Sequence, residues 1–280
     1  MDYHHSDIVA AYRELGVKPG QIVHFKSNLA SLGILGGTDG KPVLDPEPLL
    51  DAHYHALREC LGHEGTLVVG SASTNLMGTT TPYDPDQTPG EMGIFSEYLR
   101  KKKGAVRSFH AFCSYAALGP KAAAICGSVS RNDYGPFTPE QRMCELGAWD
   151  LTIGLAPNVT CSVVHNAEFM MGVPYRYQKE ISHPVQLKSG EIKQESFYCY
   201  VWYRGMYPDC DSIDRGGENR NRHFFKEFVK KGHPLKNASL GRAQAWFYPM
   251  APFCQTCMEM MKDNPYAFLA RPPVHRPYQK

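Results

Sequence analysis

The stretch Gly65-Thr66-Leu67-Val68-Val69-Gly70 is a short apolar run, rich in β-branched residues, between two glycines. Its length and composition predict a central strand in a sheet that is covered on both faces. Residues 44–61, which open at Asp45-Pro46, predict a helix before this strand, and residues 21–26 before the helix alternate as a strand does. Strand, helix and strand in this order predict an α/β fold.

Further elements extend from this unit in both directions. An amphipathic first helix is expected at residues 6–15, capped by Ser6, and another at residues 94–100, entered at Thr88-Pro89. Strands are expected at residues 112–118 and 149–155 and as two runs within residues 180–203, and helices at residues 121–126, 224–231 and 253–262. Because no repeat or low-complexity linker divides the chain, we expect one domain spanning residues 1–280.

Composition excludes several classes of protein. The chain of 280 residues is 42% hydrophobic and 21% charged, and its net charge is only +2, so no global excess of charge draws it to nucleic acid or to a membrane. Its first residues lack the pattern of a signal peptide, and no run approaches the ~18 apolar residues of a membrane span. We therefore expect a soluble cytoplasmic protein.

The cysteines indicate reduced thiols. Nine of them are scattered along a long chain, an odd number that does not suit a disulfide framework. The only local pattern, Cys254-Gln255-Thr256-Cys257, lacks a second ligand pair, so we expect two helix cysteines there and no metal.

Two clusters carry candidate chemistry. His110 lies among apolar residues after a basic turn, where an imidazole is either a packing residue or a catalytic one. Ser162, His165 and Glu168 follow one another at a spacing of three residues, so on a helix they lie close to one face. A hydrated helix face is the alternative. A third feature, the small residues of 27–37 after the first strand, offers backbone N–H groups that could bind an anion.

In register, several segments resemble the aminoglycoside 3-N-acetyltransferase family from about residue 15 to about residue 247. The carriers are residues 16–20, 31–37, 65–69, the loop from Asp84-Pro85 through Thr88-Pro89 to Met92-Gly93, Arg107-Ser108-Phe109-His110 and His165-Asn166-Ala167-Glu168. The resemblance implies a single α/β domain with a mixed sheet sandwiched between helices (α/β/α), with acetyl-CoA as donor and an amine as acceptor.

The resemblance also implies roles for individual residues. His110 is expected to be the general base, with Glu168 orienting its imidazole or holding the incoming ammonium, and His165 belongs to the same catalytic group. The expected coenzyme residues are Lys26, Ser27, Asn28, Ser31, Leu32, Gly33, Ile34, Leu35, Gly36, Ser71, Ser73 and Arg107. The expected acceptor residues are Tyr83, Asp84, Ser162 and Arg215. Ser162 or the backbone around Ser71 would donate to the developing oxyanion.

The chain departs from the family pattern at informative places. Lys26-Ser27-Asn28 stands where His-Ser-Ser is usual, and Ala111 follows His110 where proline is usual. Aminoglycosides are polycations that call for a site rich in carboxylates, whereas this chain is slightly basic. The expected acceptor is therefore another amine, such as an amino sugar, an aminoglycoside-like compound or a biosynthetic intermediate, including one with an acidic group.

Two alternatives stay open at this point. One is a catalytically inactive scaffold of the same fold that binds coenzyme A or another ligand. The other is a hydrolase that uses Cys113 or Cys161 with a histidine, which requires a thiolate. The expected partner is a small-molecule amine, with a homodimer as a further expectation.

Overall fold

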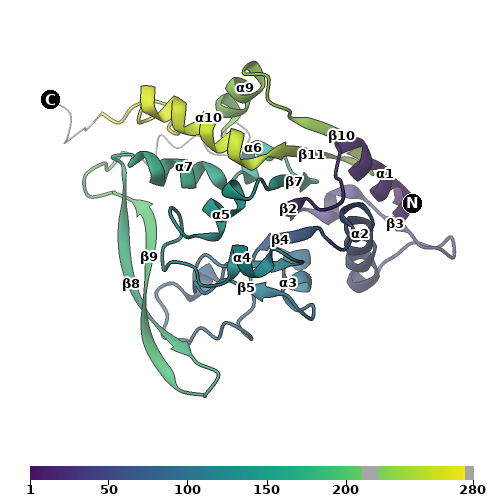
Figure 1. The fold of residues 1–280 in the computed structure, drawn as a ribbon, viewed down its shortest axis with the longest axis horizontal. Helices are drawn as coiled ribbons and strands as arrows, with labels where there is room; N and C mark the ends of the chain where they lie inside the picture. Colours follow the sequence, from purple (N-terminus) through teal and green to yellow (C-terminus); the bar gives the residue numbers. More distant parts are fainter. Residues whose placement is uncertain (210–220, 275–280) are drawn as a thin grey trace.

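A seven-stranded mixed sheet forms the centre of the computed structural model, which describes residues 1–209 and 221–274 (Figure 1). Its strand order is β10-β11-β7-β2-β4-β6-β5. The central strands β7 (Trp149–Ile153), β2 (Ile22–Ser27) and β4 (Thr66–Gly70) run parallel. The outer strands β5 (Val106–Arg107), β6 (Tyr115–Leu118), β10 (Lys236–Leu240) and β11 (Ala243–Pro249) pair antiparallel with their neighbours.

Helices cover both faces of this sheet because side chains alternate along each strand. Val23 and Phe25 of β2 pack with α1 (His5–Leu15), α2 (Pro46–Leu61) and α3 (Ile94–Arg100). Ile22 and Val68 face the opposite core, which contains residues of α4 (Ala122–Cys126), α5 (Pro139–Glu145), α7 (Val163–Met171), α9 (Arg222–Lys230) and α10 (Met250–Asp263). The predicted α/β/α sandwich is confirmed.

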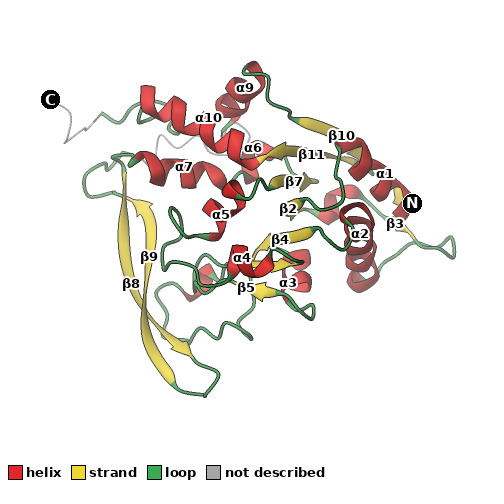
Figure 2. Ribbon diagram, in the orientation of Figure 1, coloured by secondary structure: helices red, strands yellow, loops and turns green. Residues whose placement is uncertain are grey.

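A long antiparallel hairpin, β8 (Arg176–Gln186) and β9 (Ile192–Trp202), forms a sheet of its own. It stands at the side of the molecule opposite α1 and α2 (Figure 2). Its inner face, with Val185 and Phe197, closes a small core with residues of the loop after β4 and with Phe112. The minor elements are β1 (Tyr3–His4), which pairs with β3 (Leu35–Gly36), the short helix α6 (Pro157–Thr160), and 3₁₀ turns at Leu29–Leu32 and Thr74–Leu76.

Two predicted boundaries, those of the first helix and of β6, are wrong for local reasons. The first helix begins at His5, not after Ser6, and the Asp7 carboxylate accepts the N–H of His4 at its start. Helix α3 spans residues 94–100 as predicted, but it is entered at Gly93, which has a φ of 100°, since Thr88 and Pro89 lie in a loop whose carbonyl groups bind other side chains. Strand β6 starts only at Tyr115, because the chain before it forms a tight turn.

Candidate active site

A cavity of about 280 Å³ opens where the three parallel strands end. In open α/β sheets this edge, at the carboxyl ends of the strands, is where ligands bind. The described residues that line it are His24, Phe25, Lys26, Ser27, Gly70, Met92, Ser96, Tyr115, Leu155, Thr160 and Ser162. We call it the strand-end cavity. It brings together Lys26, Ser27 and Ser162 of the residues that the sequence singled out.

Lys26 supplies a positive charge at the wall of this cavity. Its ammonium donates to Asp150 Oδ2 and to the carbonyl oxygen of Thr160, both at 2.7 Å. Asp150 is fully buried, and burial raises the pKa of its carboxyl while the Lys26 charge opposes that rise. An ammonium has three N–H groups, so one is left for a ligand.

His165 and Glu168 form a close pair on α7. The Nδ1 atom of His165 lies 2.6 Å from Oε2 of Glu168, as expected for two residues three apart on a helix. A carboxylate at Nδ1 favours the tautomer with the proton on that nitrogen and leaves the Nε2 lone pair available. The His165 side chain is 27% exposed, so a ligand can reach it.

Glu168 is held as a carboxylate by its other partners. Its Oε1 accepts hydrogen bonds from the Tyr175 hydroxyl at 2.8 Å and from Arg176 Nε at 3.0 Å. Burial alone would raise the pKa of Glu168, but the Arg176 charge and the His165 contact outweigh it and lower that pKa. Glu168 therefore orients His165. The expectation that it orients His110 is wrong.

His110 lies among apolar side chains, as the sequence predicts, but its geometry does not suit the general base that the resemblance implies. It is 2% exposed, and its ring packs against Phe112 and Phe197. Its Nδ1 accepts the backbone N–H groups of Phe112 and Cys113, and burial lowers its pKa to about 4. Since a general base needs a free lone pair and access to the acceptor, this geometry favours the packing alternative for His110.

The glycine-rich segment after β2 does not reach the strand-end cavity. The residues concerned are Asn28, Ser31, Leu32, Gly33, Ile34, Leu35 and Gly36, none of which lines it. Leu32 and Leu35 are buried in the core, and Ser31 donates to the Asn28 and Gly154 carbonyl groups. The expected anion cradle is filled by the chain itself, because the Ile34 N–H donates to the Asp2 carboxylate.

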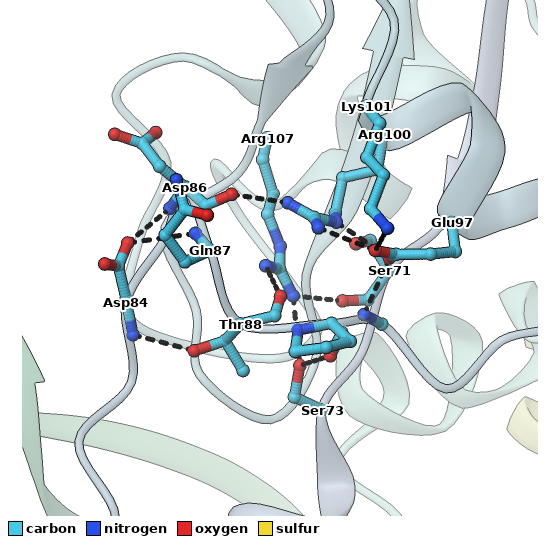
Figure 3. Close-up of polar contacts among 12 residues, drawn as sticks. Ser71, Ser73, Asp84, Asp86, Gln87, Thr88, Glu97, Arg100, Lys101 and Arg107 are labelled. Atoms are coloured by element: carbon cyan, nitrogen blue, oxygen red, sulfur yellow. Dashed lines mark hydrogen bonds and ion pairs between the residues drawn. The ribbon is translucent and has the colours of Figure 1, made fainter.

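Arg107 binds protein groups instead of pointing to a ligand. Its guanidinium donates to the carbonyl oxygens of Ser71, Pro85 and Thr88 and to the hydroxyls of Ser73 and Ser114. Figure 3 shows this side chain inside the loop that follows β4. Arg107, Ser71 and Ser73, predicted to bind coenzyme, thus hold residues 71–89 against β5 and β6.

The predicted acceptor residues are scattered. Tyr83 is fully buried in the small core, and the Asp84 carboxylate accepts the N–H groups of Asp86 and Gln87 in a local turn. Ser162 lines the strand-end cavity and donates to Glu140 Oε1 at 2.8 Å. Arg215 lies outside the described residues.

The thiols do not suit nucleophilic chemistry. Burial raises the pKa of Cys161 to about 12 and raises that of Cys113, so both are thiols near neutral pH. This disfavours the hydrolase alternative. In the described part of the chain, no group of three or more histidine, cysteine or acidic side chains is placed to hold a metal ion.

Sequence reasoning missed several residues of the site. Asp150 and Glu140 are fully buried carboxyls, and Arg176 begins β8. Asp150 within a strand of apolar residues was the one available signal, because a buried carboxyl requires a partner.

The family is identified by a sequence model. The model described as aminoglycoside 3-N-acetyltransferase matches residues 26–262. The chain belongs to this family. The resemblance found in the sequence is thus confirmed, and the protein is an acyltransferase that uses acetyl-CoA.

Relatives and solved structures agree. Aminoglycoside N(3)-acetyltransferase VII of Streptomyces paromomycinus is 29% identical over 71% of this chain and 68% of its own length. Aminoglycoside N(3)-acetyltransferase IX of Micromonospora chalcea is also 29% identical, over 73% and 75%. The fold resembles aminoglycoside acetyltransferase AAC(3)-Xa, with a TM-score of 0.76, 23% identity and 92% of each chain covered. It also resembles AAC-IIIb in binary complex with CoASH, with a TM-score of 0.75, 20% identity and coverage of 97% and 100%.

The structure also bears on membrane association. None of the helices within residues 1–209 and 221–274 combines the length and the apolar character that crossing a bilayer requires.

Proposed function

We propose that the protein transfers the acetyl group of acetyl-CoA directly to an amine of an amino sugar or a related compound, with His165 as the general base. The contact between His165 Nδ1 and Glu168 Oε2 carries this proposal. An ammonium cannot attack a thioester, so the Nε2 atom of His165 first accepts a proton from it. The thioester supplies an acetyl carbon that is open to attack by the resulting amine. When the carbon–sulfur bond breaks, His165 returns this proton to the departing thiolate, and the extra proton on the new amide nitrogen passes to solvent, so the products are the amide, coenzyme A as its thiol and one proton.

The strand-end cavity suits the thioester end of the coenzyme. Its exposed walls are largely apolar, with Met92 and Leu155, and its polar lining residues include Lys26, Ser27 and Ser162. As the amine attacks, the carbonyl oxygen gains negative charge, and the third N–H of Lys26 is a donor for it. Relatives named as aminoglycoside acetyltransferases support an acceptor built from amino sugars.

The test uses the same substitution at two histidines. His165→Asn removes the base, so we expect thiol release from acetyl-CoA to fall by roughly 10²–10⁴-fold. His110→Asn keeps an acceptor for the Phe112 and Cys113 N–H groups, and we expect it to stay active. Both variants should keep the rise in Tm that coenzyme A produces in the wild type. If no amine yields thiol while that rise persists, the protein is an inactive coenzyme-binding scaffold.

A further inference from the structure

A second groove lies at the open end of the β8–β9 hairpin. Its volume is about 620 Å³, and it runs between the hairpin and Met77 of the loop after β4. We call it the hairpin groove. Its charged lining residues are Arg176, Lys179 and Arg204, and among the described residues that line it there is no aspartate or glutamate. Glu168 already pairs with Arg176, so the charge that a ligand in the groove meets depends on the other two cations, Lys179 and Arg204.

The hairpin groove adjoins the candidate base. Arg176 belongs to both places, because its Nε donates to Glu168 Oε1 while its guanidinium lies 4.2 Å from the centre of the Trp202 ring. The Phe268 ring bridges the remaining gap, with its centre 6.1 Å from that of Trp202 and 5.5 Å from that of His165. The hairpin groove thus lies beside the residues that hold His165.

Lys179 is the side chain of the groove that can form an ion pair with an anionic group of a ligand. It is exposed on β8, and in the described part of the chain no carboxylate lies within ion-pair distance of it. The other lysines of the hairpin differ, since Lys188 pairs with Asp86 at 3.5 Å and Lys193 with Glu191 at 3.6 Å.

The remaining donors and the wall of the groove support the same kind of ligand. Within the described residues, Arg176 uses Nε and Nη1 on Glu168 and the Tyr200 carbonyl, which leaves the N–H groups of Nη2. The Tyr177 and Tyr203 rings, with centres 4.9 Å apart and planes tilted by 44°, provide aromatic faces against which a sugar ring can pack.

We propose that the hairpin groove binds the part of the acceptor that does not react, and that it selects an amine carrying a phosphate or carboxylate group. The proposal rests on the proposed function, because it assigns the acceptor to that same site. A polycationic aminoglycoside would place an ammonium group beside Lys179, and like charges oppose binding. An anionic group would instead form charge-assisted hydrogen bonds with Lys179 and Arg176.

The test compares an anionic, a simple and a polycationic acceptor. Thiol release is measured with glucosamine 6-phosphate, glucosamine and kanamycin, for the wild type, Lys179→Glu and the matched control Lys193→Glu. We expect the wild type to prefer glucosamine 6-phosphate to glucosamine, and Lys179→Glu to lose about tenfold in kcat/KM for the phosphate compound, mainly through KM. Glucosamine should change little, and Lys193→Glu should resemble the wild type throughout.

A binding measurement separates this proposal from the proposed function. Calorimetry with N-acetylglucosamine 6-phosphate and N-acetylglucosamine needs no chemical step. One outcome is that no amine is acetylated, that the phosphate compound binds more tightly than N-acetylglucosamine, and that Lys179→Glu abolishes this difference in affinity. That outcome supports the subsite and refutes the proposed function. The subsite is refuted if the phosphate gives no advantage in either assay, if kanamycin is the preferred acceptor, or if Lys193→Glu has the same effect as Lys179→Glu.

Discussion

Replacing Glu168 by glutamine tests the pair on α7 most directly. The change removes a fully buried carboxylate while Arg176, whose side chain is only 9% exposed, keeps its charge. Breaking a buried ion pair from one side costs about 3–5 kcal/mol, and we expect the lower figure because Arg176 retains the Tyr200 carbonyl and the Trp202 ring. The kcat should fall by roughly 10³-fold, because a neutral amide no longer fixes the tautomer of His165 or stabilises its cation.

Urea unfolding measures the first effect, and thiol release at saturating substrate measures the second. The double variant Glu168→Gln/Arg176→Met should regain much of the stability but none of the activity. Glu140→Gln is the matched control, since burial raises the pKa of this carboxyl, which accepts hydrogen bonds from Tyr115 and Ser162, and an amide can replace it. A Glu168→Gln enzyme that loses stability and keeps its kcat would refute the assignment of His165 as the base.

Three further predictions follow from the site and its supports. Arg107→Met should raise the KM for acetyl-CoA and increase proteolysis within residues 71–93, because several loop carbonyls lose their hydrogen-bond donor. The control is Arg142→Met, which removes a guanidinium that binds the carbonyls of Ile125, Gly127 and Ser128. It should lower stability without changing that KM. Lys26→Met should lower kcat by roughly 10²-fold with the Tm rise from coenzyme A retained, and an unchanged kcat would exclude Lys26 as the oxyanion donor. The pKa of His110 is about 4 in the folded protein and 6.5 in the unfolded chain, so the unfolded chain binds the extra proton first. The free energy of unfolding therefore falls by about 3 kcal/mol as the pH drops from 6.5 to 4. Acid unfolding of His110→Asn should lack this contribution, and a stability curve identical to that of the wild type would contradict the prediction.

Local sequence was sufficient for most elements of the sheet. The apolar run at Thr66–Gly70 and the Pro46 entry to α2 are encoded within a few residues, so the pattern located both. The contact between His165 and Glu168 follows from helix geometry alone. That much of the site was therefore predictable.

Contacts between distant segments were not predictable in the same way. Lys26 and Asp150 are 124 residues apart, and which carboxyl Lys26 binds is decided by the pairing of β2 with β7. The role of His110 depended on the direction of its Nδ1, which is set by a turn of three residues. The resemblance implied that Arg107 binds coenzyme, and no local pattern could show that three backbone carbonyls and two serine hydroxyls accept its hydrogen bonds instead.

The separate sheet of the β8–β9 hairpin has a consequence for how such an enzyme diversifies. Its outward residues, such as Tyr177 and Lys179, lie outside the two cores that stabilise the central strands. Substitutions on an exposed surface of this kind usually change stability by less than about 0.5 kcal/mol. Substitutions can thus change the outer surface of the hairpin while the strands that end at the strand-end cavity keep their sequence. Selection can then act on the hairpin surface with little loss of stability in the rest of the fold.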